Sequence, residues 1–379
     1  MTNDTEITDK KNKNNNKRKN NTPIKTDGEP PEKKPNQHII FEDDDYDYQD
    51  YFNKLIEPVI REEDKPLVEI DHPINSLMDL IELGRMYDSS KRYNIDMKVL
   101  SNLVDSLTEL NNMIGMETVK QDMVDHILFK IQKLDQNHMD MMHTVIQGPP
   151  GVGKTEVARI IGKVYLAMGI LKNDKFIKAK RSELIGQYLG ETSKFTQRII
   201  NNAEGGILFI DEVYSLGNPE KRDSYSKECI DTINENLTER KTDFICIIAG
   251  YKKEIDSCFF SYNPGLERRF PIRFTIDTYK PEEIFLIFKK KVSDCNWTLH
   301  ESITDKFFID NFEHFKYYGG DMEVLLSRCK RAHSRRVFAS ISNIKKELNM
   351  TDMNRGFEYF KAHRKVKETE SDLWKTMFM

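Results

Sequence analysis

Eight consecutive residues have the types and the spacing of a phosphate-binding loop. They match the pattern G-x-x-x-x-G-K-[ST], and in order they are Gly148, Pro149, Pro150, Gly151, Val152, Gly153, Lys154 and Thr155. Glycines let backbone N–H groups turn inward around phosphate oxygens, and the N-terminus of a following helix adds the positive end of its dipole. We expect the Lys154 ammonium to reach the β- and γ-phosphates of a nucleotide and the Thr155 hydroxyl to be a ligand of Mg²⁺. The loop therefore predicts a nucleotide site.

A second chemical pattern lies further along the chain, where four apolar residues (207–210) run into Asp211 and Glu212. A strand of only apolar residues is buried on both faces, and its carboxyl end is where an open α/β sheet places its ligands. Asp211 can hold Mg²⁺ through water, and Glu212 can polarise an attacking water as a general base. Together with the loop, this pair predicts hydrolysis of the bound nucleotide.

Short β-type runs separated by helical stretches must position these groups. The runs cover residues 143–147, 175–180, 206–211, 244–249 and 272–276. Strands that alternate with helices indicate a parallel α/β sheet, with the loop between the first strand and a helix over Glu156–Met168. After Pro281, helical patterns over residues 284–292, 303–312, 324–338 and 352–363 predict a smaller all-α domain.

The chain before the sheet divides into three predicted parts. Residues 1–38 hold three apolar residues, with nine Lys or Arg against six Asp or Glu, and we expect a disordered Lys/Asn-rich tail. Residues 39–73 read as an acidic linker, since 41–50 carries six acids and no base. Residues 74–106 show two amphipathic helical patterns, which could pack on the main domain or bind a partner.

Composition narrows the class of protein. The 379 residues carry a formal charge of −4, and outside the two N-terminal stretches they are nearly neutral, which argues against binding nucleic acid by bulk charge. No run reaches the ~18 apolar residues that a membrane helix needs. The five cysteines form no C-x-x-C pair, so we expect reduced thiols and no zinc site. These features predict a soluble cytoplasmic protein without membrane contact, and the basic tail leaves the nucleus as an alternative.

Six blocks of sequence resemble the AAA+ ATPases, and most of all the subgroup of red-type rubisco activase and stage V sporulation protein K. They are residues 110–115, 148–155, 184–192, 205–212, 248–251 and 263–271. The resemblance runs from about residue 110 to 363. It implies an α/β P-loop NTPase fold with a five-stranded parallel sheet (107–280), a helical lid (281–363) and a C-terminal tail (364–379). It also implies ATP and Mg²⁺ as cofactors and a ring, usually of six subunits, with ATP between neighbours.

The same resemblance implies roles for further residues. Arg269, with Arg268 in reserve, would be an arginine finger that reaches the γ-phosphate of the adjacent subunit and would join Lys154 and Glu212 in catalysis. Ile114 and Gly115 would contact the nucleotide. A pore loop that grips polypeptide would consist of Tyr188, Leu189 and Gly190, with charge from the nearby Lys178, Lys180 and Arg181.

Two positions depart from the common family pattern. Tyr251 follows the fourth strand, where a polar sensor such as Asn is frequent, and its hydroxyl could orient water. Glu323 stands where many members carry a second-sensor arginine, so either it points away from the phosphates or the lid senses nucleotide differently, through Arg328. A basic helix face formed by Arg328, Arg331 and Arg335 reads as solvated or subunit-facing, with nucleic acid as the alternative.

Three functions follow from these patterns. The leading one is an ATP-hydrolysing ring that remodels or threads a protein substrate. The second is a nucleic-acid motor or loader, and the third is a scaffold in which nucleotide sets only the assembly state. Glu212 argues against the third, because binding alone needs no acid that activates water.

Overall fold

The computed structural model describes residues 61–134, 141–188, 190–220, 222–338 and 346–377. The predicted tail (1–38), most of the acidic linker and Leu189 of the pore loop therefore lie outside the described residues.

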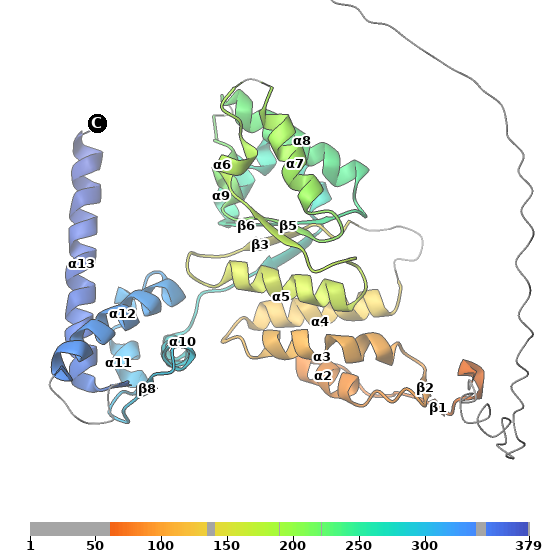
Figure 1. The fold of residues 1–379 in the computed structure, drawn as a ribbon, viewed down its shortest axis with the longest axis horizontal. Coiled ribbons are helices and arrows are strands. Elements are labelled where there is room, and N and C mark those ends of the chain that lie inside the picture. The colour runs from red at the N-terminus through yellow and green to blue at the C-terminus, as the bar shows by residue number, and fades with distance from the viewer. Residues whose placement is uncertain (1–60, 135–140, 189, 221, 339–345, 378–379) are drawn as a thin grey trace, which may run out of the picture. The chain divides into compact units, whose positions relative to one another are not determined.

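A five-stranded parallel sheet carries the nucleotide-binding domain (Figure 1). Its strands are β3 (Thr144–Gln147), β4 (Phe176–Ala179), β5 (Ile207–Ile210), β6 (Ile245–Gly250) and β7 (Ile272–Thr275). Their order in the sheet is β4-β5-β6-β3-β7, so β6 separates the strand before the phosphate loop from the strand before Asp211. The three central strands are wholly buried, as expected for a parallel sheet that is covered on both faces. The predicted α/β fold is confirmed.

Helices cover both faces of this sheet (Figure 1). One face carries α4 (Glu117–Ile131) and α5 (Lys154–Ala167), and the other carries α6 (Arg181–Leu184), α7 (Thr192–Asn202), α8 (Ser224–Glu239) and α9 (Lys252–Cys258). Successive β5 side chains point to opposite faces, so Phe209 joins the core under α5 while Leu208 joins the core under α7 and α8. Short 3₁₀ helices are η1 (Glu62–Asp64), η2 (Val213–Leu216), η3 (Phe260–Tyr262), η4 (Glu267–Arg269) and η5 (Phe312–His314).

The N-terminal extension packs on the main domain. Helix α3 (Met97–Asn111) lies against α5, and α2 (Leu77–Arg85) lies against α3. The two helices cross closely at Gly84, where a Cβ would come within 2.5 Å of the Leu100 carbonyl oxygen. Both helices contribute to the core under α5. Strand β1 (Leu67–Val68), before α2, pairs in parallel with β2 (Arg92–Tyr93), which lies between α2 and α3.

The lid consists mainly of α10 (Pro281–Asp294), α11 (Asp305–Asp310), α12 (Tyr318–Arg336) and α13 (Met350–Met377). It is not purely helical as expected, because β8 (Thr298–Leu299) pairs in parallel with β9 (Glu347–Leu348). Helix α13 also continues through most of the segment predicted as a C-terminal tail. Residues 364–377 are rich in Lys, Glu and other strong helix formers and contain neither Gly nor Pro, so nothing in them ends the helix.

No helix among the described residues is both long enough and apolar enough to cross a bilayer.

Candidate nucleotide-binding site

The phosphate loop connects β3 to the first turn of α5. Its first residue, Gly148, donates its N–H to the Gly250 carbonyl at 3.2 Å, which fixes the loop against the end of β6. Gly151 and Gly153 have φ values of +74° and +91°, a left-handed backbone that side chains rarely adopt. Gly153 immediately precedes α5, so the free N–H groups of the helix N-terminus face the loop. This is the backbone arrangement that binds phosphate.

The Lys154 ammonium lies within the curve of the loop. It donates hydrogen bonds to the carbonyls of Gly148 and Pro149 at 3.0 and 2.8 Å, and it lies 5.0 Å from the centroid of the Tyr251 ring. Burial lowers the pKa of Lys154, and the negative charges of Asp211 and Glu212 oppose this shift. Its two acceptors are neutral carbonyls, so a phosphate would offer the ammonium a stronger, charged partner.

Thr155 and Asp211 meet across the sheet edge. The Thr155 hydroxyl donates to Asp211 Oδ2 at 3.0 Å, and the Lys178 ammonium from β4 contacts the same oxygen at 2.8 Å. A hydroxyl and a carboxylate are the hard oxygen ligands that Mg²⁺ prefers, so these two residues fit a magnesium site.

Glu212 follows β5 in an unusual conformation. Its φ of 50° places a non-glycine residue in the left-handed region, and such residues cluster at functional sites at a cost of about 1–3 kcal/mol. The turn directs η2 away from the strand and leaves the Glu212 side chain exposed. With Lys154, Thr155 and Asp211 it lines a cavity of about 370 Å³. The structure thus gathers the four predicted phosphate, metal and base residues around one cavity.

Two tyrosines complete this cavity. Tyr214, which the sequence analysis did not single out, stacks on Tyr251 with ring centroids 5.3 Å apart and an interplanar angle of 21°. Burial is the largest of the effects that raise the pKa of Tyr214. The charges of Tyr251 and Glu212, and hydrogen bonds with these two residues, raise it further, so the Tyr214 hydroxyl stays protonated beside the Glu212 carboxylate. The signal in the sequence was the position of Tyr214 two residues after Glu212, on the turn that the acidic pair begins.

A larger cleft of about 530 Å³ adjoins the first and reaches the lid. Its apolar lining is Met113, Ile114, Val152, Tyr279 and Ile287, which suits a nucleoside. The lid touches the phosphate loop here, because the Gly319 N–H donates to the Gly151 carbonyl at 3.1 Å. Gly115, predicted beside the nucleotide, forms a left-handed turn (φ +64°) next to Glu283 of α10 and is not among the described residues that line the cleft.

Glu323 lines this cleft, and its charge is paired. Its carboxylate lies 3.6 Å from the Lys291 ammonium of α10, and its side chain is 78% exposed. Among the described residues, the cations along the cleft are Lys290 and Lys291 of α10, whereas Arg328 is not part of the lining. The repulsion expected from an unpaired acid is therefore reduced by a neighbouring lysine, which sequence spacing could not reveal.

The two candidate finger arginines lie on η4, and neither is among the described residues that line the nucleotide cavities. Arg269 donates to the Thr238 hydroxyl at 2.6 Å and to the Gly265 carbonyl at 2.7 Å. Arg268 is exposed. The Arg269 side chain is thus held by partners of its own chain, outside these two cavities.

The candidate pore loop joins α6 to α7. The Tyr188 side chain is 69% exposed, and a Cβ at Gly190 would meet no atom within 4 Å. Two of the three cations that precede the loop have partners within the chain. Lys178 binds Asp211, and Arg181 is held within the subunit by the Ser215 and Leu216 carbonyls (2.6 and 2.9 Å) together with Asp223 and Ser226.

Comparisons with known proteins agree with this geometry. The model of the family described as "ATPase family associated with various cellular activities (AAA)" matches residues 144–278. The chain is 42% identical over 373 residues to a cfxQ-like protein of Acanthamoeba polyphaga mimivirus, a match covering 92% of this chain and 90% of that protein. It is 36% identical over 199 residues to stage V sporulation protein K of Bacillus subtilis, covering 51% of this chain and 61% of that protein. It is 30% identical over 242 residues to the chloroplastic ribulose bisphosphate carboxylase/oxygenase activase of Cyanidioschyzon merolae, covering 60% and 81%. The resemblance drawn from the sequence is thereby confirmed, and the chain belongs to the AAA ATPase family.

Proposed function

We propose that this AAA ATPase forms a ring, of six subunits as is usual in the family, that hydrolyses Mg²⁺–ATP to remodel or thread a protein substrate through its pore. The observation that carries the proposal is the shared cavity of Lys154, Thr155, Asp211 and Glu212, which follow β3 and β5, the strands on either side of β6. It combines a cradle for phosphate, oxygen ligands for magnesium and an acid that can activate water. The ring would work inside the cell, where ATP is supplied.

Each group in the cavity has a distinct role in this proposal. Lys154 would leave its carbonyl acceptors for the β- and γ-phosphates, whose charge makes a stronger hydrogen bond. Thr155 and Asp211 would hold Mg²⁺, which when bound supplies positive charge to the phosphates. Glu212 would accept the proton of the attacking water, and the neutral Tyr214 hydroxyl would hold the Glu212 carboxylate in position.

The neighbouring subunit would complete the site. A guanidinium supplied in trans neutralises charge in the transition state of phosphoryl transfer and accelerates related reactions by about 10³–10⁵. We propose Arg269 for this role, with Arg268 as the alternative. Its contacts with Thr238 and Gly265 would hold the arginine ready at the subunit surface.

Tyr188 would be the residue that contacts and moves the protein substrate. An exposed aromatic ring gives a large contact area that tolerates varied side chains. Arg181 provides a physical link, because it binds the carbonyls of η2, which begins after Glu212, and sits at the start of the segment that leads to Tyr188. A change at the catalytic acid could therefore reach the pore loop through one side chain.

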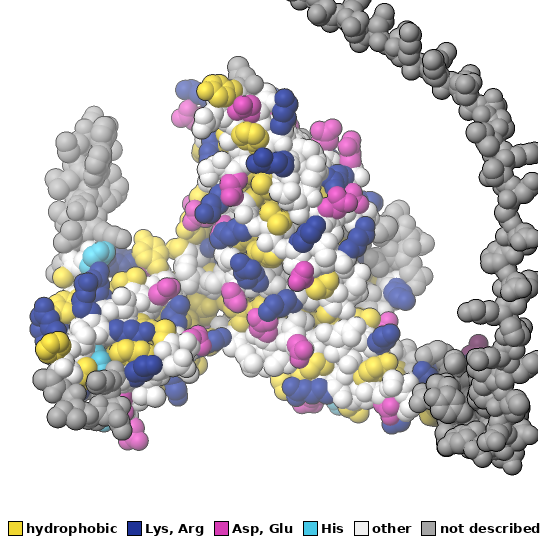
Figure 2. Space-filling model, viewed as in Figure 1, with side chains coloured by type: hydrophobic (Ala, Val, Ile, Leu, Met, Phe, Trp, Pro, Cys, Tyr) yellow, Lys and Arg dark blue, Asp and Glu magenta, His cyan; other side chains and the backbone are white. Residues whose placement is uncertain are grey.

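A nucleic-acid motor is the second candidate, and the lid charge is the observation that favours it. Figure 2 shows basic side chains mixed with acidic ones over the α/β domain and more densely grouped on the lid. A hydrogen bond from Arg355 and the charges of Arg335 and Arg331 lower the pKa of Tyr359, which places three arginines around one α13 side chain. ATP hydrolysis that is stimulated by DNA or RNA with a steep salt dependence would support this candidate over protein remodelling.

The deciding experiment is phosphate release from the purified full-length protein and from the variant Glu212→Gln. The variant should keep ATP binding while turnover falls at least 100-fold, since general-base catalysis contributes about 10²–10⁴. Glu220→Gln, which changes an exposed acid on the same segment, is the matched control and should keep wild-type turnover. Turnover of Glu212→Gln within threefold of wild type would refute the assigned base, and absence of hydrolysis in the wild type would favour the scaffold.

The same variant can identify the substrate. A Glu212→Gln ring held in the ATP state should retain its partners in an extract of its native cell. The substrate itself is not determined by the nucleotide site, and we propose that residues 1–105, which precede the family resemblance, choose it.

A further inference from the structure

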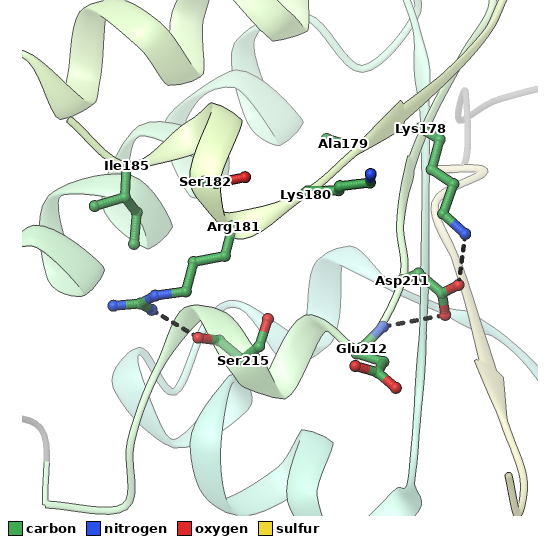
Figure 3. Close-up of a pocket in the computed structure, with 9 residues that line it drawn as sticks. All are labelled: Lys178, Ala179, Lys180, Arg181, Ser182, Ile185, Asp211, Glu212 and Ser215. Carbon is green, nitrogen blue, oxygen red and sulfur yellow. Dashed lines mark hydrogen bonds and ion pairs between the residues drawn. The ribbon is translucent and has the colours of Figure 1, made fainter.

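One oxygen of Asp211 is shared by two donors from different elements. Asp211 Oδ2 accepts the Thr155 hydroxyl from α5 at 3.0 Å. The same oxygen contacts the Lys178 ammonium from β4 at 2.8 Å (Figure 3). Lys178 reaches it because β4 is the neighbour of β5, with Lys178 opposite Phe209 in the parallel register. Its ammonium also lies 5.6 Å from the centroid of the Phe209 ring, so the side chain extends from β4 toward β5.

The position of this ion pair differs from that of an ordinary surface pair. The side chains of Lys178 and Asp211 are 38% and 25% exposed, and both line one cavity together with Glu212. Thr155 and Asp211 are the proposed magnesium ligands, so the ammonium occupies the carboxylate that the metal would use. Two cations that approach one carboxylate repel each other, and the carboxylate cannot bind both with full strength.

We propose that Lys178 is a built-in counter-cation of Asp211 that competes with magnesium, so that binding of Mg²⁺–nucleotide displaces the Lys178 ammonium from Asp211. This inference rests on the magnesium–nucleotide site of the proposed function. It gives Lys178 a positioning role: the lysine keeps the Asp211 charge neutralised and directed toward Thr155, and it sets how much magnesium the site requires.

A cavity beside Asp211 could accommodate the displaced Lys178 ammonium. Lys178 lines a cavity of about 640 Å³, and Asp211, Glu212 and Ser215 also line it. The flexible stem of a lysine can move its charge within this space without moving β4. Arg181 in the same cavity cannot replace it, because its guanidinium is held by Ser215, Leu216, Asp223 and Ser226.

The size of the effect follows from the exposure of the pair. Partly exposed ion pairs are worth at most about 1 kcal/mol, which corresponds to about fivefold in an equilibrium constant. Replacing Lys178 by methionine keeps the length of the stem and removes the charge. The magnesium concentration for half-saturation should then fall about fivefold.

The test measures binding without turnover. Magnesium is titrated against the full-length protein and a fluorescent, non-hydrolysable ATP analogue, and binding is followed by fluorescence anisotropy. Lys178→Met should bind at about fivefold lower magnesium than wild type, and Lys178→Arg, which keeps the charge, should stay within twofold of wild type. Lys180→Met is the matched control, because this lysine lines the same cavity and is not among the described partners of Asp211, and it should leave the magnesium requirement unchanged.

The outcomes separate this inference from the proposed function. If Lys178→Met needs the same or more magnesium, the competition is refuted while the nucleotide site stands. If wild-type protein binds the analogue equally well with magnesium and with a chelator, both the proposed metal site and the proposed competition are refuted. Circular dichroism checks folding, and if Lys178→Met is unfolded, Lys178→Gln takes its place with the same expected decrease.

Discussion

Replacing Gly151 by alanine would drive a methyl group from the phosphate loop into the lid. A Cβ at this position would lie 2.0 Å from the Tyr317 carbonyl oxygen, a separation far below any that real Cβ atoms show. The clashing oxygen belongs to the backbone, so no side-chain rotation can relieve the contact. The lid would have to retreat by about 1 Å or more, as overpacked contacts force their neighbours to do. That retreat would break the hydrogen bond from the Gly319 N–H to the Gly151 carbonyl.

Three contributions should therefore lower the free energy of unfolding. Gly151 has φ +74°, and an L-residue in this left-handed region costs about 1–2 kcal/mol. Loss of the hydrogen bond to the lid adds about 1 kcal/mol, and the remaining contact strain adds a comparable amount. We expect a total loss of about 3 kcal/mol.

Gly169 supplies the matched control. Its φ is +73°, and a Cβ there would meet nothing within 4 Å, so Gly169→Ala carries the backbone cost without the clash. Urea denaturation of both variants without nucleotide should show a larger loss for Gly151→Ala by at least about 1 kcal/mol. Hydrogen exchange at the Gly319 amide should be faster in Gly151→Ala alone. Equal losses in the two variants, with unchanged exchange at Gly319, would refute the contact between loop and lid.

The remaining predictions concern the subunit interface, the pore and the sheet core. Arg269→Ala should keep ATP binding and lose about 10³-fold or more in turnover in an assembled ring, with Arg268→Ala as the comparison. If Arg268→Ala alone abolishes turnover, the two roles are exchanged. Tyr188→Ala should keep basal ATP hydrolysis and lose remodelling of a loosely folded test protein, whereas Tyr188→Phe should retain both; equal remodelling by both variants would exclude the aromatic grip. His143 is buried, with Nδ1 accepting the Cys246 N–H at 3.0 Å, and burial lowers its pKa to about 4. The His143 imidazole binds a proton more readily in the unfolded chain than in the folded protein. Its contribution to the free energy of unfolding is therefore fully present above the unfolded pKa of about 6.5. It is lost as the pH falls toward 4, by up to about 3 kcal/mol. Denaturation of wild type and His143→Gln between pH 7 and 4 should show a flatter profile for the variant, and parallel profiles would contradict this assignment.

Local patterns in the sequence were sufficient to predict the candidate catalytic residues that follow individual strands. The phosphate loop is eight residues between a strand and a helix, and Asp211 and Glu212 end an apolar strand. The carboxyl ends of parallel strands share one edge, so these groups could be expected near one another before any coordinates. The lid helices were also predictable from their apolar spacing, whereas the short β8–β9 pair was not, because two residues carry no period.

Only the tertiary structure decided which neighbours these groups have. The order β5-β6-β3 sets Tyr251 between the phosphate loop and the acidic pair, where Tyr214 stacks on it. The pairing of β4 with β5 brings the Lys178 ammonium to Asp211 across a separation of 33 residues. Likewise, the packing of α10 beside α12 gives Glu323 its partner Lys291. Helical and strand periodicity report contacts within a few residues along the chain. The pairing of distant strands and helices depends on how all their buried faces fit together, and it is this fit that places a competing cation at the predicted metal site.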